Sequence, residues 1–217
     1  MDIKKKIIGE NKPIIIVFNS NIFDPNNFEM EKSLKSFEVN NIFLRDRYLS
    51  WYTKGVFGFS KSLEETKNKL EEEIREIKPN KIITIGLSSG GFAALYFGNL
   101  LKVNHIIACS PQIIINNYTI KYYYNKLKHI DNEISILPLN ENIDIHIFWC
   151  KFDDFIGIDR KNNAYVEQNR NDEKQYELVK NIKNVKNIQV DGGNHGDIMR
   201  IIVKNGELFK ILNKYIL

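Results

Sequence analysis

Short apolar runs alternate with amphipathic stretches along this chain of 217 residues. The apolar runs are rich in isoleucine and valine, a composition typical of strands that are buried on both faces of a sheet. The expected strands are residues 14–18, 41–44, 82–85, 105–109, 144–149 and 187–190. Such strands, separated by helical segments, favour a mostly parallel sheet with helices on both faces.

The helical segments carry recognisable start and stop signals. Ser62 and Glu65 form the pattern of a capping box, which predicts a helix from there to about Ile77. Its apolar positions fall on one face. We also expect a short helix over residues 28–37 and a C-terminal helical segment over 197–216, broken at Asn205-Gly206.

Residues 112–142 depart from this alternation. The segment is too long for a simple connection and contains several tyrosines and lysines. We interpret it as a small helical cap over the carboxyl edge of the sheet, after the strand that ends near Cys109. An ordinary covering helix with a solvated lysine face is the alternative. The length fits one domain spanning residues 1–217.

Composition and charge exclude several classes. The net charge of +4 is spread along the chain, whereas nucleic-acid binding calls for a concentrated basic face, so no nucleic-acid partner is expected. No apolar run is long enough to span a membrane. Cys109 and Cys150 each end an apolar run and are expected to be buried free thiols. These features, with no credible signal peptide, predict a cytoplasmic protein.

The stretch from Lys81 to Leu95 contains the most informative motif. It predicts a strand, a sharp turn and a small-residue helix, with Ser88 at the tip of the turn. Gly86-Leu87-Ser88-Ser89-Gly90 matches the G-x-S-x-G pattern of a nucleophile elbow, in which glycines relieve the clashes of a strained serine. The alternative is an ordinary glycine-rich turn. A Walker loop is excluded, because no Gly-Lys-Ser or Gly-Lys-Thr follows.

A serine nucleophile needs a general base. Of the four histidines, His195 lies in a glycine-rich loop between the last expected strand and the final helix, where its imidazole can reach the elbow. His105 and His146 lie in strands and suit structural roles, and His129 lies in the expected cap. Since His195 has no partners at metal-ligand spacing, no metal is expected.

The base needs an acid to orient it, and that acid should follow the preceding long strand. Asp153 is the first candidate, Asp154 the second and Asp159 a more distant third. For the oxyanion hole we expect the backbone N–H of Ser89 and, from the loop after the first strand, that of Asn19.

The loop after the second strand contains Arg45, Trp51 and Tyr52, which we expect to line a substrate pocket. A guanidinium and aromatic faces suit a sugar or a phosphodiester. In the alternative interpretation, the two aromatic rings pack in the core and Arg45 pairs with Asp46.

With Ser88, Asp153 and His195 in that order, the chain resembles the α/β-hydrolase superfamily over nearly its whole length. Arg45-Asp46 followed by Trp51-Tyr52, the doubled glycine of the elbow, and Ser110-Pro111-Gln112 resemble small bacterial hydrolases of capsule and cell-surface glycan loci, some of which are polysaccharide O-acetyltransferases.

The resemblance implies a serine enzyme that acts through an acyl-enzyme. It transfers an acetyl ester to a bacterial surface carbohydrate, or removes one. No cofactor is implied beyond acetyl-CoA as a possible acyl donor, and the partner is a small acyl ester or a glycan. A thioesterase or generic carboxylesterase is the alternative. The alternative that is not an enzyme is a catalytically silent protein of this fold, which binds a glycan or a protein.

Overall fold

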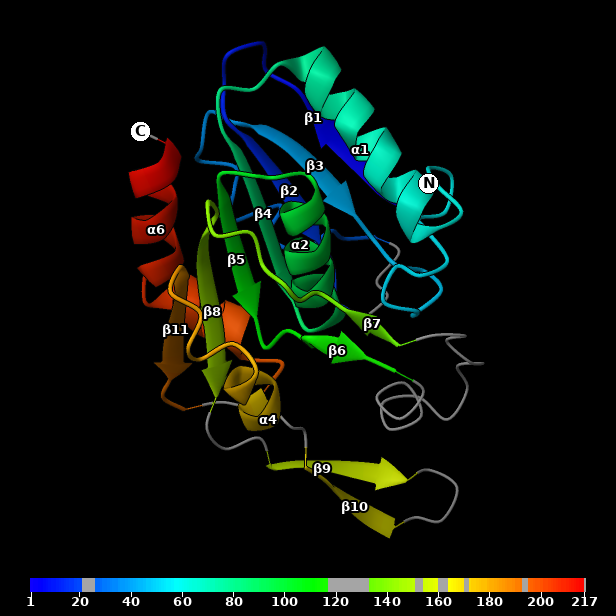
Figure 1. Cartoon of the computed structure of the whole chain (residues 1–217), viewed down its shortest axis with the longest axis vertical. Coiled ribbons are helices and arrows are strands. Elements are labelled where there is room, and N and C mark those ends of the chain that lie inside the picture. Colours follow the sequence, from blue (N-terminus) through cyan, green and yellow to red (C-terminus); the bar gives the residue numbers. More distant parts are fainter. Residues whose placement is uncertain are drawn as a thin grey trace.

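The computed structural model describes residues 1–20, 26–116, 133–150, 154–159, 164–169, 172–192 and 195–216. A seven-stranded sheet in the order β1-β3-β2-β4-β5-β8-β11 organises these residues (Figure 1). Its strands are β1 (Ile3–Lys6), β2 (Ile14–Phe18), β3 (Asn40–Leu44), β4 (Ile82–Leu87), β5 (His105–Cys109), β8 (Asp144–Cys150) and β11 (Val185–Val190). All neighbours pair in parallel except β1, which runs antiparallel to β3.

The six strands expected from the apolar runs are confirmed, with small extensions at their ends. Strand β1 was not expected. It reads Ile-Lys-Lys-Lys and its three lysines are exposed, so it has none of the apolar periodicity of a buried strand. Its antiparallel register with β3, from Ile3 opposite Leu44 to Lys6 opposite Asn41, places these lysines at the edge of the sheet.

Helices cover both faces of the sheet, as expected. Alternate residues of β2 show this division, because Ile14 and Ile16 pack toward α1 (Leu63–Ile77) and α2 (Ser89–Leu100). Ile15 and Val17 pack into a second apolar cluster that includes α5 (Ile198–Lys204) and α6 (Glu207–Ile216). A period of two along each strand thus divides the core into two layers.

The helix boundaries follow the predicted signals. Ser62 caps α1 by accepting a hydrogen bond from the Glu65 N–H at 3.1 Å. The expected break in the C-terminal segment is confirmed: α5 ends at Lys204 and α6 begins at Glu207, with Gly206 between them at φ +80°. A left-handed residue of this kind ends a helix, and glycine adopts it without steric cost.

The helix expected over residues 28–37 is wrong. The segment forms a series of turns, with one helical hydrogen bond from the Leu34 N–H to the Met30 carbonyl at 3.0 Å. Met30 has φ 64°, a left-handed conformation that interrupts a right-handed helix.

Two small antiparallel ladders and one short helix lie outside the main sheet. Strands β6 (Ile114–Ile115) and β7 (Ile134–Ser135) pair at the ends of the expected cap. Residues 117–132, on which the prediction of a helical cap depends, lie outside the described residues. The hairpin of β9 (Asp154–Asp159) and β10 (Ala164–Asn169) and the helix α4 (Asp172–Glu177) were not expected.

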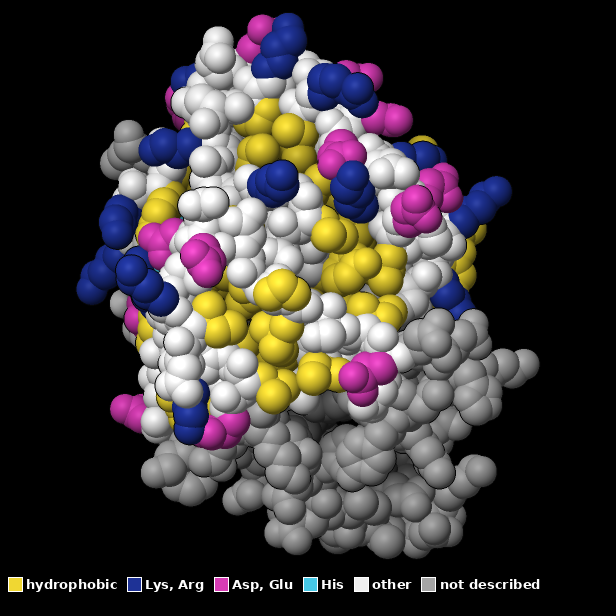
Figure 2. Space-filling model, viewed as in Figure 1, with side chains coloured by type: hydrophobic (Ala, Val, Ile, Leu, Met, Phe, Trp, Pro, Cys, Tyr) yellow, Lys and Arg dark blue, Asp and Glu magenta, His cyan; other side chains and the backbone are white. Residues whose placement is uncertain are grey.

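Charges of both signs are interspersed over the described part of the face seen in Figure 2, with apolar side chains between them. Among the described residues, no helix combines the length and apolar character that crossing a membrane requires. Cys109 and Cys150 are buried thiols that form no disulfide, as predicted.

Candidate active site

The glycines of the elbow are required by backbone packing. A Cβ on Gly86 would lie 2.0 Å from the carbonyl oxygen of Gly90, and a Cβ on Gly90 would lie 2.1 Å from the carbonyl oxygen of Phe18. Neither space holds a methyl group, so the strand, the turn and the first turn of α2 approach one another only with glycine at both positions. The contact with Phe18 also brings the loop after β2 against the helix start.

Ser88 stands between β4 and α2 with φ 56° and ψ −119°. A non-glycine residue in this conformation is strained, and such strain collects at functional sites. The surroundings hold it: the Ser88 N–H donates to the Cys109 carbonyl at 2.8 Å, and its own carbonyl accepts from the Phe92 N–H at 2.9 Å. Ser89 begins α2, and an N–H in the first turn of a helix has no acceptor within that helix.

His195 meets the elbow. Its Nε2 lies 2.8 Å from Ser88 Oγ, which is the contact that a general base makes with a serine nucleophile. His195 stands in the loop between β11 and α5, and only 2% of its surface is exposed. The structure therefore brings together two residues that the sequence predicted as partners.

The contact between His195 and Ser88 does not show which aspartate orients the imidazole. Asp153 lies outside the described residues, while Asp154 and Asp159 are the first and last residues of β9. The order of the chain places all three after β8, as the sequence predicted. Asp153 and Asp154 stay as predictions for the orienting carboxylate.

The prediction that the Asn19 amide lines the oxyanion hole is wrong. This N–H donates to the Leu44 carbonyl oxygen at 2.9 Å, continuing the pairing of β2 with β3 beyond the strand end. The next amide, that of Ser20, donates to Oε1 of Glu29 at 3.1 Å. The N–H of Ser89 remains a donor that the helix leaves available.

Trp51 and Tyr52 are buried in the core rather than exposed toward a substrate, so the pocket-lining prediction is wrong for both. They are 1% and 0% exposed. Trp51 Nε1 donates to Gln112 Oε1 at 2.8 Å. The Tyr52 hydroxyl lies 2.9 Å from the Asn19 carbonyl oxygen and 3.1 Å from that of Leu44, so it anchors the loop after β2.

Asp46 shapes the loop that carries these rings. Its carboxylate accepts backbone N–H bonds from Tyr48 at 3.0 Å, Ser50 at 2.6 Å and Tyr52 at 2.9 Å. Burial raises the pKa of Asp46 although these amides favour its charged form. The loop includes Leu49, Trp51 and Tyr52 at positive φ, so the carboxylate holds a strained backbone in place.

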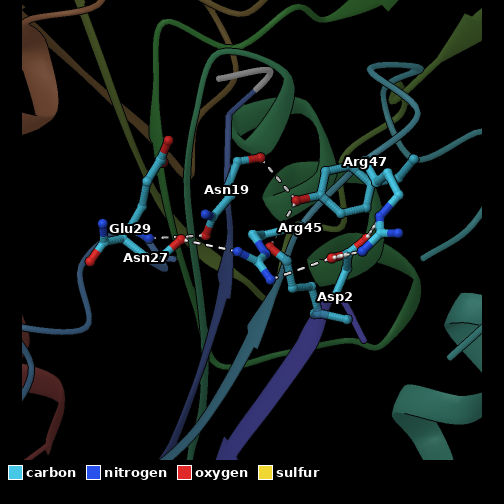
Figure 3. A network of polar contacts seen from close by, with 8 residues as sticks. Asp2, Asn19, Asn27, Glu29, Arg45 and Arg47 are labelled. Atoms are coloured by element: carbon cyan, nitrogen blue, oxygen red, sulfur yellow. Dashed lines mark hydrogen bonds and ion pairs between the residues drawn. The ribbon is translucent and has the colours of Figure 1, made fainter. Parts of the chain in front are cut away.

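Arg45 is also held inside the protein. It pairs with Asp2, with 3.4 Å between the guanidinium and the carboxylate, and its guanidinium lies 4.1 Å from the ring centre of Phe28. Figure 3 shows Arg45 and Arg47 converging on Asp2, a contact that crosses from the loop after β3 to the chain start. Among the described residues the guanidinium thus pairs with Asp2 rather than with Asp46, and its expected contact with a substrate stays a prediction.

Sequence reasoning missed Glu29. Its Oε1 accepts from both the N–H and the hydroxyl of Ser20. Its own N–H donates to Asn19 Oδ1 at 3.2 Å, a bond drawn in Figure 3. Burial raises the pKa of Glu29 above 4.5, partly offset by these bonds. No local pattern announces this residue, because its partners lie in a different loop.

The topology and the elbow define the class: the chain has the α/β-hydrolase fold. A similar solved structure is the capsule O-acetyltransferase of Neisseria meningitidis serogroup A, as a histidine-to-alanine variant in complex with CoA. The TM-score is 0.67 at 16% identity, over 95% of this chain and 90% of that chain.

Two further structures are similar. Est1E from Butyrivibrio proteoclasticus matches with TM-score 0.54 and 12% identity over 96% of this chain and 93% of that one. The acylaminoacyl peptidase of Pyrococcus horikoshii matches with TM-score 0.58 and 16% identity, over 97% of this chain and 38% of the peptidase. No protein-family model and no curated protein sequence matches the chain.

Proposed function

We propose that the protein is a serine acyl enzyme that transfers a small acyl group through an acyl-Ser88 intermediate. The observation that carries the proposal is the 2.8 Å approach of His195 Nε2 to Ser88 Oγ, at a serine held in a strained turn. A serine so placed, with a base in hydrogen-bond reach, is equipped for nucleophilic attack on an acyl carbon.

The steps follow from these positions. His195 Nε2 accepts the Ser88 proton as Oγ attacks the acyl carbonyl carbon. The oxyanion forms beside the start of α2, where the Ser89 N–H donates to it. The leaving group takes the proton from His195, and the acyl-enzyme remains. A second hydroxyl, activated by the same imidazole, then attacks and releases the acyl group from Ser88.

Asp153 is our candidate for the carboxylate that orients His195, and Asp154 is the alternative. Either one would fix the imidazole tautomer and stabilise its charged form. The corrected positions of Trp51 and Tyr52 give them a supporting role in this account. They pack under the loops that carry Asn19 and Gln112.

For the substrate, we propose an acetyl group donated by acetyl-CoA or an acetyl ester, with a carbohydrate hydroxyl as acceptor. The support is the similarity to the meningococcal capsule O-acetyltransferase over 95% of this chain, together with the CoA in that structure. Est1E supports an alternative in which water is the acceptor and the protein is an esterase or thioesterase.

The test is intact-mass spectrometry after incubation with acetyl-CoA in the absence of any acceptor. We expect acetylation of the wild-type protein and none of Ser88→Ala. Release of free CoA without stable acetylation would favour the thioesterase alternative. If neither acetyl-CoA nor p-nitrophenyl acetate acylates the protein or is turned over by it, the proposal fails and a silent binding protein remains.

A further inference from the structure

A second group of polar side chains lies at the amino ends of the strands, whereas Ser88 lies at their carboxyl ends. His105 is the first residue of β5 and pairs in register with Asp144, the first residue of β8. His146 follows two residues later on β8 and therefore points to the same face as Asp144. Ser88, by contrast, follows the carboxyl end of β4.

The three side chains converge. One potential ligand atom from each of His105, Asp144 and His146 lies within 4.8 Å of the others. The two imidazole rings are 4.8 Å apart between centres, at an angle of 69°. Tyr215 of α6 covers them: its ring stacks on His105 at 3.8 Å, and its hydroxyl is hydrogen-bonded to the Asp144 carboxylate.

Three imidazole nitrogens of this group have no well-formed hydrogen bond among the described residues. His105 is 0% exposed, and neither of its ring nitrogens has a well-formed hydrogen bond among the described residues, although the Asp144 backbone lies near the ring. Nδ1 of His146, a residue 7% exposed, has no partner within the same residues. Buried polar atoms without partners are rare and costly, and a bound ion is one of their recognised explanations.

We propose that His105, His146 and Asp144 bind a divalent transition-metal ion of the zinc class. Two imidazoles and one carboxylate are a donor set that zinc adopts, with a fourth position left for another oxygen. The ion would give one nitrogen of each imidazole a partner and would join β5 to β8.

The positive charge of two nearby lysines and the present spacing of the ligand atoms both oppose binding of the ion. Lys186 pairs with Asp144 at 2.9 Å, and Lys214 adds a second positive charge near His146. Lys186 is 50% exposed, so its ammonium can move into solvent when an ion takes its place. The ligand atoms must also close from 4.8 Å to the spacing of about 3.3 Å implied by zinc–nitrogen bonds near 2.0 Å.

The test is a Co²⁺ titration of the chelator-treated protein, followed by visible absorption, with Zn²⁺ added as a competitor. We expect one Co²⁺ per chain, a d–d spectrum, and its loss as Zn²⁺ displaces Co²⁺. His146→Gln should weaken binding at least about tenfold. Lys186→Gln removes the charged competitor for Asp144 and should tighten binding. His195→Ala serves as the control for metal held at the elbow and should bind as the wild type does.

Absence of a Co²⁺ spectrum in the wild type overturns the proposal, as does unchanged affinity in His146→Gln. Lys186→Gln alters an exposed side chain and keeps the test decisive if His146→Gln does not fold, because unchanged affinity there contradicts Asp144 as a ligand. Loss of binding in His195→Ala would place the ion at the elbow instead. None of these readouts depends on acyl transfer.

Discussion

His195 Nε2 lies 2.8 Å from Ser88 Oγ, although 107 residues separate the two along the chain. The contact joins the loop after β11 to the turn after β4, two strands that are separated in the sheet by β5 and β8. Parallel pairing brings the carboxyl ends of all four strands to one edge. The fold thus converts a remote sequence pair into a nucleophile and its base.

Substituting Asp153 and Asp154 one at a time identifies which carboxylate orients His195. We expect Asp153→Asn to lower kcat for p-nitrophenyl acetate by about 10⁴-fold, because an amide holds the wrong histidine tautomer. Asp154→Asn should leave kcat close to the wild-type value. If only Asp154→Asn abolishes turnover, the acid is Asp154.

Gly90 is predicted to be irreplaceable for steric reasons. A Cβ at this position lies 2.1 Å from the Phe18 carbonyl oxygen, so Gly90→Ala should lower the free energy of unfolding by about 1–3 kcal/mol or more and reduce turnover. Gly9→Ala is the control. A Cβ there meets no atom within 4 Å, so only its φ of +148° opposes alanine, at a cost of about 1–3 kcal/mol, and turnover should be retained. Urea unfolding and an esterase assay measure both. Equal losses of turnover in the two variants would contradict the steric argument.

The Tyr52 hydroxyl is predicted to support catalysis by holding the loop after β2. Tyr52→Phe removes its bonds to the Asn19 and Leu44 carbonyl oxygens, with an expected stability loss of about 1–3 kcal/mol and a lower kcat. Ser62→Ala, which removes the cap of α1, should cost about 1 kcal/mol and leave kcat unchanged. If Tyr52→Phe also preserves kcat, the Tyr52 hydroxyl contributes to stability alone and not to catalysis.

Glu29 is predicted to make stability depend on pH. Because burial raises its pKa in the folded protein above 4.5, the folded state holds this proton more tightly than the unfolded chain. Its contribution to stability therefore falls as pH rises from about 4.5 through the folded pKa. Each unit by which the folded pKa exceeds the unfolded pKa corresponds to roughly 1.4 kcal/mol of the free energy of unfolding.

Glu29→Gln removes that titration while keeping an oxygen that can accept from Ser20. The variant should gain stability relative to the wild type between acidic and neutral pH, measured by urea unfolding at a series of pH values. A difference between the two proteins that stays constant with pH would contradict the assignment.

Local patterns were sufficient where a segment's own residues determine its structure. The strand at His105–Cys109 follows from its apolar run, and the cap at Ser62 follows from a hydroxyl three residues before the N–H that donates to it. The elbow is equally local, since Gly86 contacts Gly90. These features required no knowledge of the rest of the fold.

Long-range contacts decided the rest. Arg45 stands next to Asp46 in sequence, but three backbone amides bind that carboxylate, and Arg45 pairs with Asp2 instead. Asp2 immediately precedes the lysine-rich strand β1, which no apolar pattern announces. The Asn19 amide was misassigned for the same reason, since its acceptor, Leu44, belongs to another strand.

Labelling by a fluorophosphonate probe, read by intact mass, tests the central claim most directly. The probe forms a covalent bond with a serine only when a base activates it, so it reports the pairing of Ser88 with His195 without knowledge of the substrate. The account predicts one adduct on the wild-type protein, none on Ser88→Ala and greatly slowed labelling of His195→Ala. An unlabelled wild type, or Ser88→Ala labelled as fast as the wild type, would contradict it.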